Sequence, residues 1–152
     1  MAVTELLNLP NQGVLLGLDP GTKTIGVAAS DSLQYTALPV ETLQRGKKLS
    51  PTLARLFELF DERKAVGMVI GLPLNMDGSS GPRVQSARAL ARHILEQRDI
   101  LIAFQDERMS SQEANRAMLE ADMSRAKRAD AIDKSAAAII LQTALDTIAN
   151  AS

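Results

Sequence analysis

The stretch Gly13–Ser30, GVLLGLDPGTKTIGVAAS, decides the fold of this chain. Its apolar run Val14–Leu18 is rich in branched residues and ends abruptly at Asp19-Pro20-Gly21. Apolar residues then resume on alternate positions over Thr24–Ala29. Two strand-like runs joined by a short connection with Pro and Gly predict a β-hairpin. Asp19 therefore stands where a buried strand leaves the core.

The aspartate of this turn has two interpretations. An Asp in a turn commonly accepts a hydrogen bond from its own backbone two residues on, which would make Asp19 purely structural. Gly17, Gly21 and Gly26 surround it, however, and glycine lets another backbone or a phosphate approach closely. The second interpretation is a binding site at the tip of the hairpin.

Composition bounds the remaining possibilities. The 152 residues fit one domain, 1–152, in which we expect residues 1–12 and 150–152 to be frayed. Cysteine is absent, which excludes disulfides and thiolate sites and is compatible with the cytosol. No signal peptide or membrane span is recognisable, so we expect a cytoplasmic protein without a membrane partner. The net charge is −1, so a polyanion must be met by a local basic patch.

The order of the predicted elements indicates an α/β fold. After the hairpin, apolar patterns predict strands over 36–43, 65–72 and 99–104, helices over 50–63, 84–98 and 131–149, a further helix from Ser110, and a basic connector over 122–130. Three antiparallel strands followed by two strand–helix crossovers predict a mixed five-stranded sheet with helices on both faces.

Carboxylates follow the ends of several of these elements. Asp19 ends the first strand, Asp106 and Glu107 end the last one, and Asp133 is expected in the first turn of the final helix. Because strand side chains alternate, only one of Asp106 and Glu107 can share a site with Asp19. Clustered oxygen ligands without His or Cys favour Mg²⁺ or Mn²⁺, and two ions about 4 Å apart suit phosphodiester hydrolysis. Taken singly, each acid also has a structural explanation, such as a helix-dipole contact for Asp133.

Four motifs in this order resemble the YqgF/RuvX family of the RNase H-like superfamily. They are GLDPGTKTIGVA (17–28), GLPLNMDG (71–78), DERMSS (106–111) and DKSAAAIIL (133–141), and the resemblance extends over about residues 13–145. It implies an RNase H-like fold and a cytoplasmic, metal-dependent nuclease that processes the 5′ end of pre-16S rRNA. Members of the family are also proposed to be Holliday-junction resolvases.

The resemblance also implies roles for individual residues. Asp19, Glu107 and Asp133 fall at the positions of the family's catalytic acidic triad, and Asp106 beside them is a further candidate metal ligand. The implied cofactor is Mg²⁺ or Mn²⁺, as two ions. The implied enzyme is a hydrolase acting on phosphate esters, either an endonuclease or an exonuclease.

Basic and polar residues near the acids are candidate substrate contacts. These are Lys23, Asn75, Arg108, Arg125 and Arg128, although each also has an explanation as a solvated or turn residue. With one Tyr, three Phe and no Trp, base stacking is a poor main mode of recognition, which favours contacts to the backbone of structured RNA or branched DNA. A two-fold homodimer would position two sites on such a substrate.

Two other functions remain open at this point. The Asp-x-Gly-Thr-Lys turn also resembles the first phosphate motif of actin-like and sugar-kinase ATPases, which clamp a nucleotide between two such domains. A non-catalytic RNA-binding factor in ribosome assembly would retain the fold and the acids without hydrolysis. Nucleotide affinity would distinguish the first function, and an Asp19→Asn variant the second.

Overall fold

The computed structural model describes residues 3–21, 23–73, 81–106 and 125–151, with the side chains of the last helix described from Ala136 onward. The elements are β1 (Val3–Thr4), η1 (Leu6–Asn8), β2 (Val14–Pro20), β3 (Thr24–Ser30), β4 (Ala37–Gln44), α1 (Ser50–Glu62), β5 (Ala65–Leu72), α2 (Pro82–Gln97), β6 (Ile102–Asp106) and α4 (Arg125–Asn150). The strands form one sheet in the order β1-β6-β5-β2-β3-β4.

The predicted hairpin is confirmed as the antiparallel pair β2 and β3, in which Asp19 pairs with Gly26 and Pro20 with Ile25. Strand β4 pairs with β3 and forms one edge of the sheet. Pro39 lies on this edge strand, where its missing N–H costs no ladder bond to a further strand. On the other side, β5 and β6 run parallel to β2, as strand–helix crossovers require.

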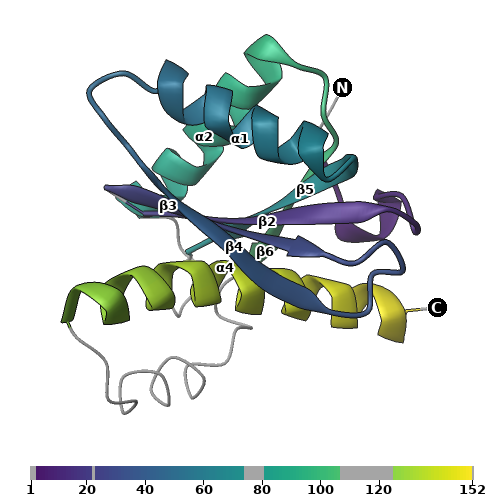
Figure 1. Ribbon diagram of the computed structural model, residues 1–152. Helices are drawn as coiled ribbons and strands as arrows, with labels where there is room; N and C mark the ends of the chain where they lie inside the picture. Colours follow the sequence, from purple (N-terminus) through teal and green to yellow (C-terminus); the bar gives the residue numbers. More distant parts are fainter. Residues whose placement is uncertain (1–2, 22, 74–80, 107–124, 152) are drawn as a thin grey trace.

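Helices cover both faces of the sheet, as predicted (Figure 1). Helices α1 and α2 lie over one face, and their apolar stripes meet side chains such as Leu16, Leu18 and Ile70. Helix α4 lies alone across the other face, where its core positions meet Leu15 and Val69. Strand β5 is buried against both layers, which explains its nearly continuous apolar sequence.

Helix α4 runs antiparallel to β2 (Figure 1). Gly17 makes this packing close, because a Cβ added there would lie 2.7 Å from Leu141 Cβ and 3.0 Å from the Ala137 carbonyl oxygen. Near the carboxyl end of the helix, the Gln142 side chain accepts a hydrogen bond from Ala37 N–H (2.9 Å) and donates one to the Tyr35 carbonyl (3.1 Å). The orientation of α4 over the sheet is thus set at two separate points.

Four local predictions are corrected by the structure. The amino-terminal segment is not wholly frayed: β1 adds a sixth strand beside β6, and Leu9, after η1, is buried in the α4 core. Strand β6 begins at Ile102, not at residue 99. The pair Ser50-Pro51 predicts a helix with Ser50 as its N-cap, but Ser50 lies inside α1, whose N-cap is Leu49 and which has no side-chain N-cap bond.

The fourth correction concerns α4, which begins at Arg125 and includes part of the expected connector. Asp133 therefore lies beyond the first turn of the helix. Because the effect of a helix dipole falls off within that turn, the dipole explanation of Asp133 no longer applies.

The helix predicted from Ser110 falls outside the described residues. Within the described part of the chain, none of the helices has the length and apolar character that a membrane span requires.

Candidate active site

Asp19 lies near the carboxyl end of β2, on the face of the sheet that α4 covers. Its neighbours Leu16 and Leu18 belong to the α1/α2 core and Leu15 to the α4 core, so alternation puts Gly17 and Asp19 on the α4 face. The residue is half-buried, and its Oδ1 atom is fully buried. A carboxylate oxygen is therefore held inside the protein at a strand end, which costs free energy unless a cation or hydrogen bonds compensate it.

Strands β5 and β6 continue the sheet beside Asp19. Leu18 pairs with Ile70 and Ile70 with Phe104, so one step further brings Asp19, Gly71 and Gln105 into line. Gly71 presents no side chain between the other two. The carboxyl ends of parallel strands are the usual place for ligand sites in α/β sheets.

The side chain of Asp106 lies on the α1/α2 face of the sheet, opposite to the face of Asp19. Its register partner Leu72 belongs to the α1/α2 core, as do Ile102 and Phe104 on alternate positions of β6. The position facing α4 beside Asp19 is instead Gln105, which follows the buried Ala103 of the α4 core. The structure thus does not bring Asp106 onto the face of Asp19, and Glu107 lies outside the described residues.

The backbone of α4 carries position 133 toward Asp19. Helix α4 crosses β2 at Gly17, where Ala137 and Leu141 make contact. Position 133 is one turn before Ala137, about 6 Å along the helix axis, and Asp19 is two residues beyond Gly17, about 7 Å along the strand. Since the helix and the strand are antiparallel, both steps lead in the same direction. The side chain of Asp133 is outside the described part of the helix, whose side chains are described from Ala136 onward.

Lys23, the predicted phosphate contact, is exposed in the turn between β2 and β3. Its carbonyl accepts a hydrogen bond from the backbone N–H of Arg45 (2.8 Å), just beyond β4. The Arg45 guanidinium in turn donates from Nη1 to the Gly21 carbonyl (2.5 Å) and to Ser86 Oγ on α2 (3.4 Å). Arg45 thereby fixes the hairpin tip to the rest of the fold.

Arg45 is a cation that the sequence analysis missed. Partial burial lowers the pKa of its guanidinium, and among the residues that the structure describes no carboxylate forms an ion pair with it. The register of β3 and β4, in which Thr24 pairs with Gln44, is the signal that places residue 45 opposite Lys23.

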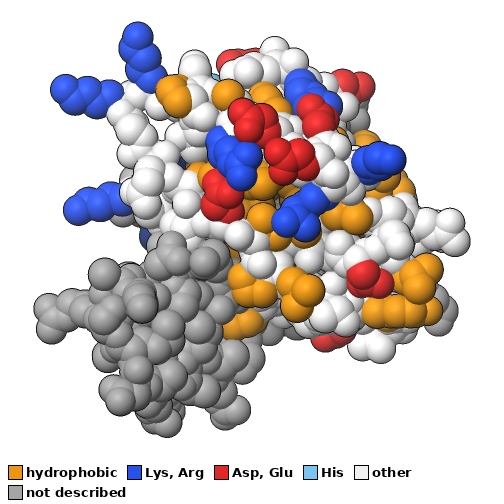
Figure 2. Space-filling view, viewed as in Figure 1, with side chains coloured by type: hydrophobic (Ala, Val, Ile, Leu, Met, Phe, Trp, Pro, Cys, Tyr) orange, Lys and Arg blue, Asp and Glu red, His pale blue; other side chains and the backbone are white. Residues whose placement is uncertain are grey.

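Lysine and arginine side chains gather at the end of the molecule where the hairpin tip and the β4–α1 connection lie, on the left of Figure 2. Lys47 and Lys48 belong to this connection and are exposed. None of the cations Lys23, Lys47 and Lys48 has an ion pair with a described residue. This end of the sheet therefore carries positive charge that is available to an anion.

The remaining predicted site residues cannot be placed by their side chains. Asn75, Glu107 and Arg108 lie outside the described residues, and Arg125 and Arg128 lie in the first turns of α4, where only the backbone is described. No group of three or more His, Cys, Asp or Glu residues that could hold a metal ion occurs within the described part. Two buried side-chain oxygens are described at the site, Asp19 Oδ1 and Gln105 Oε1. Oxygen atoms of carboxylates and amides are the metal ligands that Mg²⁺ and Mn²⁺ prefer.

Comparison with known proteins agrees with this fold. The family model described as RuvX, Holliday junction resolvase, matches residues 13–147. A protein of Rhodobacter capsulatus named "Putative pre-16S rRNA nuclease" is 54% identical over 142 residues, which are 93% of this chain and 89% of that protein. A protein of the same name from Phenylobacterium zucineum is 51% identical over 156 residues and covers 99% of both chains.

Among solved structures, RuvC of Thermus thermophilus in complex with a Holliday junction substrate is similar, with a TM-score of 0.59 and 13% identity over 92% of this chain and 98% of that one. At this identity the likeness shows a shared fold. The residues that match the RuvX model include the β2–β3 hairpin. The resemblance of this hairpin to the phosphate motif of actin-like and sugar-kinase ATPases therefore does not place the chain among those ATPases. The chain belongs to the RuvX family and has the RNase H-like fold of RuvC.

Proposed function

We propose that this protein is a metal-dependent nuclease that hydrolyses phosphodiester bonds in RNA and processes the 5′ end of pre-16S rRNA in the cytoplasm. The observation that carries the proposal is the buried carboxylate oxygen of Asp19 at the carboxyl end of β2, on the face that α4 crosses. The substrate follows from the names of relatives that are more than half identical to this chain.

In this proposal Asp19, Glu107 and Asp133 hold Mg²⁺ or Mn²⁺, as two ions. Three neighbouring carboxylates repel one another and raise one another's pKa unless cations lie between them. When bound, such ions would supply activation of the attacking water and stabilisation of the leaving oxygen. Asp106 takes no direct part, because it lies on the other face of β6.

The cationic end of the sheet supplies the contacts to the nucleic acid. Lys23 and Arg45 lie beside the turn that follows Asp19, so they would contact phosphates next to the bond that is cleaved. Asn75, Arg108, Arg125 and Arg128 are proposed to extend these contacts. Contacts of this kind recognise the backbone and the shape of a structured RNA, and they weaken as the salt concentration rises.

A second candidate activity is cleavage of branched DNA. It is favoured by the description of the family model and by the fold shared with RuvC, which was solved on a Holliday junction. Resolution of a four-way junction needs two cuts, which a homodimer with two such sites would make.

The decisive experiment compares the parent protein with Asp19→Asn on a precursor 16S rRNA leader and on a four-way DNA junction, each with and without Mn²⁺. We expect cleavage of the RNA that depends on Mn²⁺ and falls by orders of magnitude in Asp19→Asn. Removal of one charge from the acidic group should leave the metal-free protein as stable as the parent or more so. Asp99→Asn is the matched control, because Asp99 is exposed and precedes the amino end of β6, far from the carboxyl ends of the strands.

Each other outcome has a definite meaning. Cleavage of the junction alone would assign the second activity. If Asp19→Asn binds the RNA leader and supports rRNA maturation as well as the parent does, the protein is a non-catalytic assembly factor and the proposed chemistry is wrong. Asp106→Asn should reduce the rate less than Asp19→Asn.

A further inference from the structure

Gln105 is the buried polar residue of this fold that its surroundings do not explain. The residue as a whole is only 5% exposed, and its Oε1 atom is buried without a hydrogen-bond donor among the described residues. Its Nε2 atom donates one long hydrogen bond of 3.3 Å to the carbonyl of the next residue, Asp106. A buried carbonyl oxygen without a donor has lost its water and gained nothing in exchange.

The other buried polar residues show how this fold normally treats such groups. Ser30 Oγ accepts a bond from Leu15 N–H (2.9 Å), and Thr52 Oγ1 donates to the Gln44 carbonyl (2.8 Å). Gln34 donates two bonds to backbone carbonyls, at 2.9 and 3.1 Å. Each of these side chains ties two segments of backbone together. The Oε1 atom of Gln105 makes no such bond to a described residue. An apolar residue would fit this strand, because Ala103, two residues earlier on the same face, is buried in the α4 core.

Gln105 lies close to Asp19 on the same face of the sheet. It lies on the α4 face, in line with Asp19 across Gly71. Adjacent strands are about 4.8 Å apart, so the two backbone positions are about 10 Å apart, with no side chain between them. An amide oxygen is a hard ligand like a carboxylate, but it adds no negative charge to a site that already holds acids.

We propose that Gln105 is a neutral oxygen ligand of the divalent cation held at Asp19. This inference rests on the proposed function, because it places a cation at that site. It explains why a buried strand position carries an amide: the oxygen remains without a protein donor because its partner is the cation. It also explains the choice of an amide, since another acid there would increase the repulsion within the metal-free protein.

The test uses Mn²⁺ alone as the probe and binding as the readout, in the full chain without substrate. Gln105→Leu removes the oxygen and keeps an apolar side chain of similar size. We expect Mn²⁺ to bind about 10- to 100-fold more weakly, measured by calorimetric titration, which is the usual range for residues that support a metal site. In EDTA, the same variant should unfold at a urea concentration equal to or above that of the parent, because an unsatisfied buried acceptor is gone.

Gln105→Glu is the matched variant, because it keeps the oxygen and adds a charge. We expect it to bind Mn²⁺ as tightly as the parent or more tightly, and to be less stable than the parent in EDTA. If Gln105→Leu does not fold, the paired results for Gln105→Glu test the inference alone. A purely structural Gln105 would instead give two variants that lose stability in EDTA and bind Mn²⁺ as the parent does.

Asp19→Asn separates this inference from the proposed function. If Asp19→Asn loses Mn²⁺ affinity while Gln105→Leu retains it, Gln105 is not a ligand and the metal site at Asp19 stands. If neither variant changes Mn²⁺ affinity, both proposals fail.

Discussion

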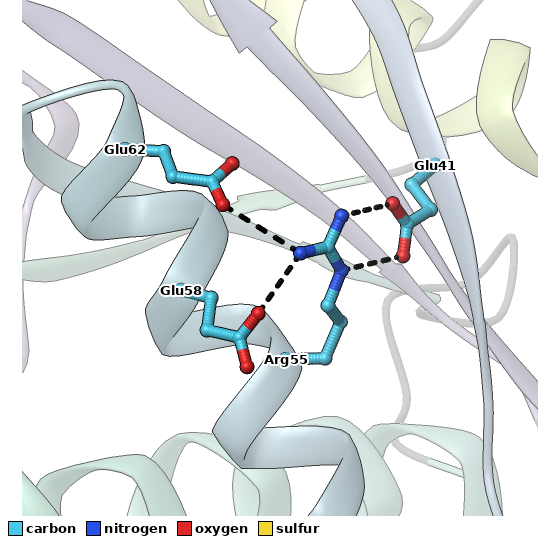
Figure 3. A network of polar contacts seen from close by, with 4 residues as sticks. All are labelled: Glu41, Arg55, Glu58 and Glu62. Carbon is cyan, nitrogen blue, oxygen red and sulfur yellow. Dashed lines mark hydrogen bonds and ion pairs between the residues drawn. The ribbon is translucent and has the colours of Figure 1, made fainter.

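Two arginines, Arg45 just after β4 and Arg55 within α1, have opposite surroundings. Arg55 on α1 lies among three glutamates: it forms two hydrogen bonds with Glu41 on β4, at 2.7 and 3.0 Å, and contacts Glu58 at 3.0 Å and Glu62 at 3.7 Å (Figure 3). The hydrogen bonds that Arg55 donates to the carboxylates of Glu41 and Glu58 raise the pKa of its guanidinium. Arg45, by contrast, bonds to the neutral oxygens of Gly21 and Ser86, and burial lowers its pKa.

The difference shows which cations of this fold are neutralised by carboxylates of the same chain and which are not. The Arg55 cluster ties the edge strand β4 to the helix above it. Arg98 is neutralised in the same way by Asp61, at 2.9 Å. At the hairpin tip the positive charges of Arg45 and Lys23 have no carboxylate partner within the described residues. A phosphate is the counter-charge that the proposed function supplies.

The largest effect that this comparison predicts is on RNA binding by Arg45→Met. A hydrogen bond to a charged group contributes about 1.5–3 kcal/mol, so loss of the guanidinium should weaken binding of the rRNA leader about 10- to 100-fold. The slope of log affinity against log salt concentration should also decrease by about one, as for one lost phosphate contact. Fluorescence anisotropy over a range of salt concentrations measures both quantities.

Arg45→Lys distinguishes charge from structure in that experiment. Lysine retains the charge but lacks the planar guanidinium, whose Nη1 atom donates to both Gly21 and Ser86. We expect Arg45→Lys to restore the salt slope and part of the affinity. Equal loss in both variants would mean that Arg45 acts only by holding the hairpin tip, and unchanged affinity in Arg45→Met would remove it from the binding surface.

A smaller effect, of another kind, is expected for Arg55→Met. All four members of the cluster are partly or largely exposed, so water already screens their attraction and the loss of stability should be small. The midpoint of urea unfolding should decrease slightly while RNA affinity and its salt slope stay at the values of the parent. A change in the salt slope would show that the Arg55 region also contacts nucleic acid, and the contrast between the two arginines would be lost.

The fold was largely predictable because its main elements repeat strong patterns. The hairpin and β5 were predicted from apolar runs bounded by Pro and Gly, and α2 from its helical stripe. Strand β1 was missed because two residues carry no periodicity. The start of α4 was placed too late because residues 125–130 contain no apolar residue larger than Ala, although Arg, Ala and Lys are good helix formers.

The site was predictable only in part. Asp19 was predicted because a carboxylate at the end of a buried strand is visible in the sequence. The face of Asp106 could not be assigned until the register of β6 against β5 was known. Arg45 and Gln105 were missed for a related reason: an arginine after a strand and a glutamine inside one are ordinary, and their roles depend on which partners the fold brings to them.

The smallest expected effect is at the other end of the hairpin, where Asp31 closes the turn between β3 and β4. Its Oδ1 accepts hydrogen bonds from Thr36 N–H (2.9 Å) and Tyr35 N–H (2.8 Å), and its Oδ2 accepts one from Leu33 N–H (3.2 Å). The bond from Thr36 is the largest cause of the lowered pKa of this carboxyl.

Because the folded pKa of Asp31 lies below its unfolded value near 3.8, the charged group contributes stability above that pH and loses the contribution as pH falls through the folded pKa. Asp31→Asn should therefore be less stable than the parent at neutral pH, by a difference that shrinks as the pH falls below 3.8 and through the folded pKa. Urea unfolding over a series of pH values from neutral to acid measures it. A difference that stays constant with pH would mean that the second acceptor oxygen matters and the charge does not. Asp31, unlike Asp19, would then be an aspartate whose charge the protein does not use.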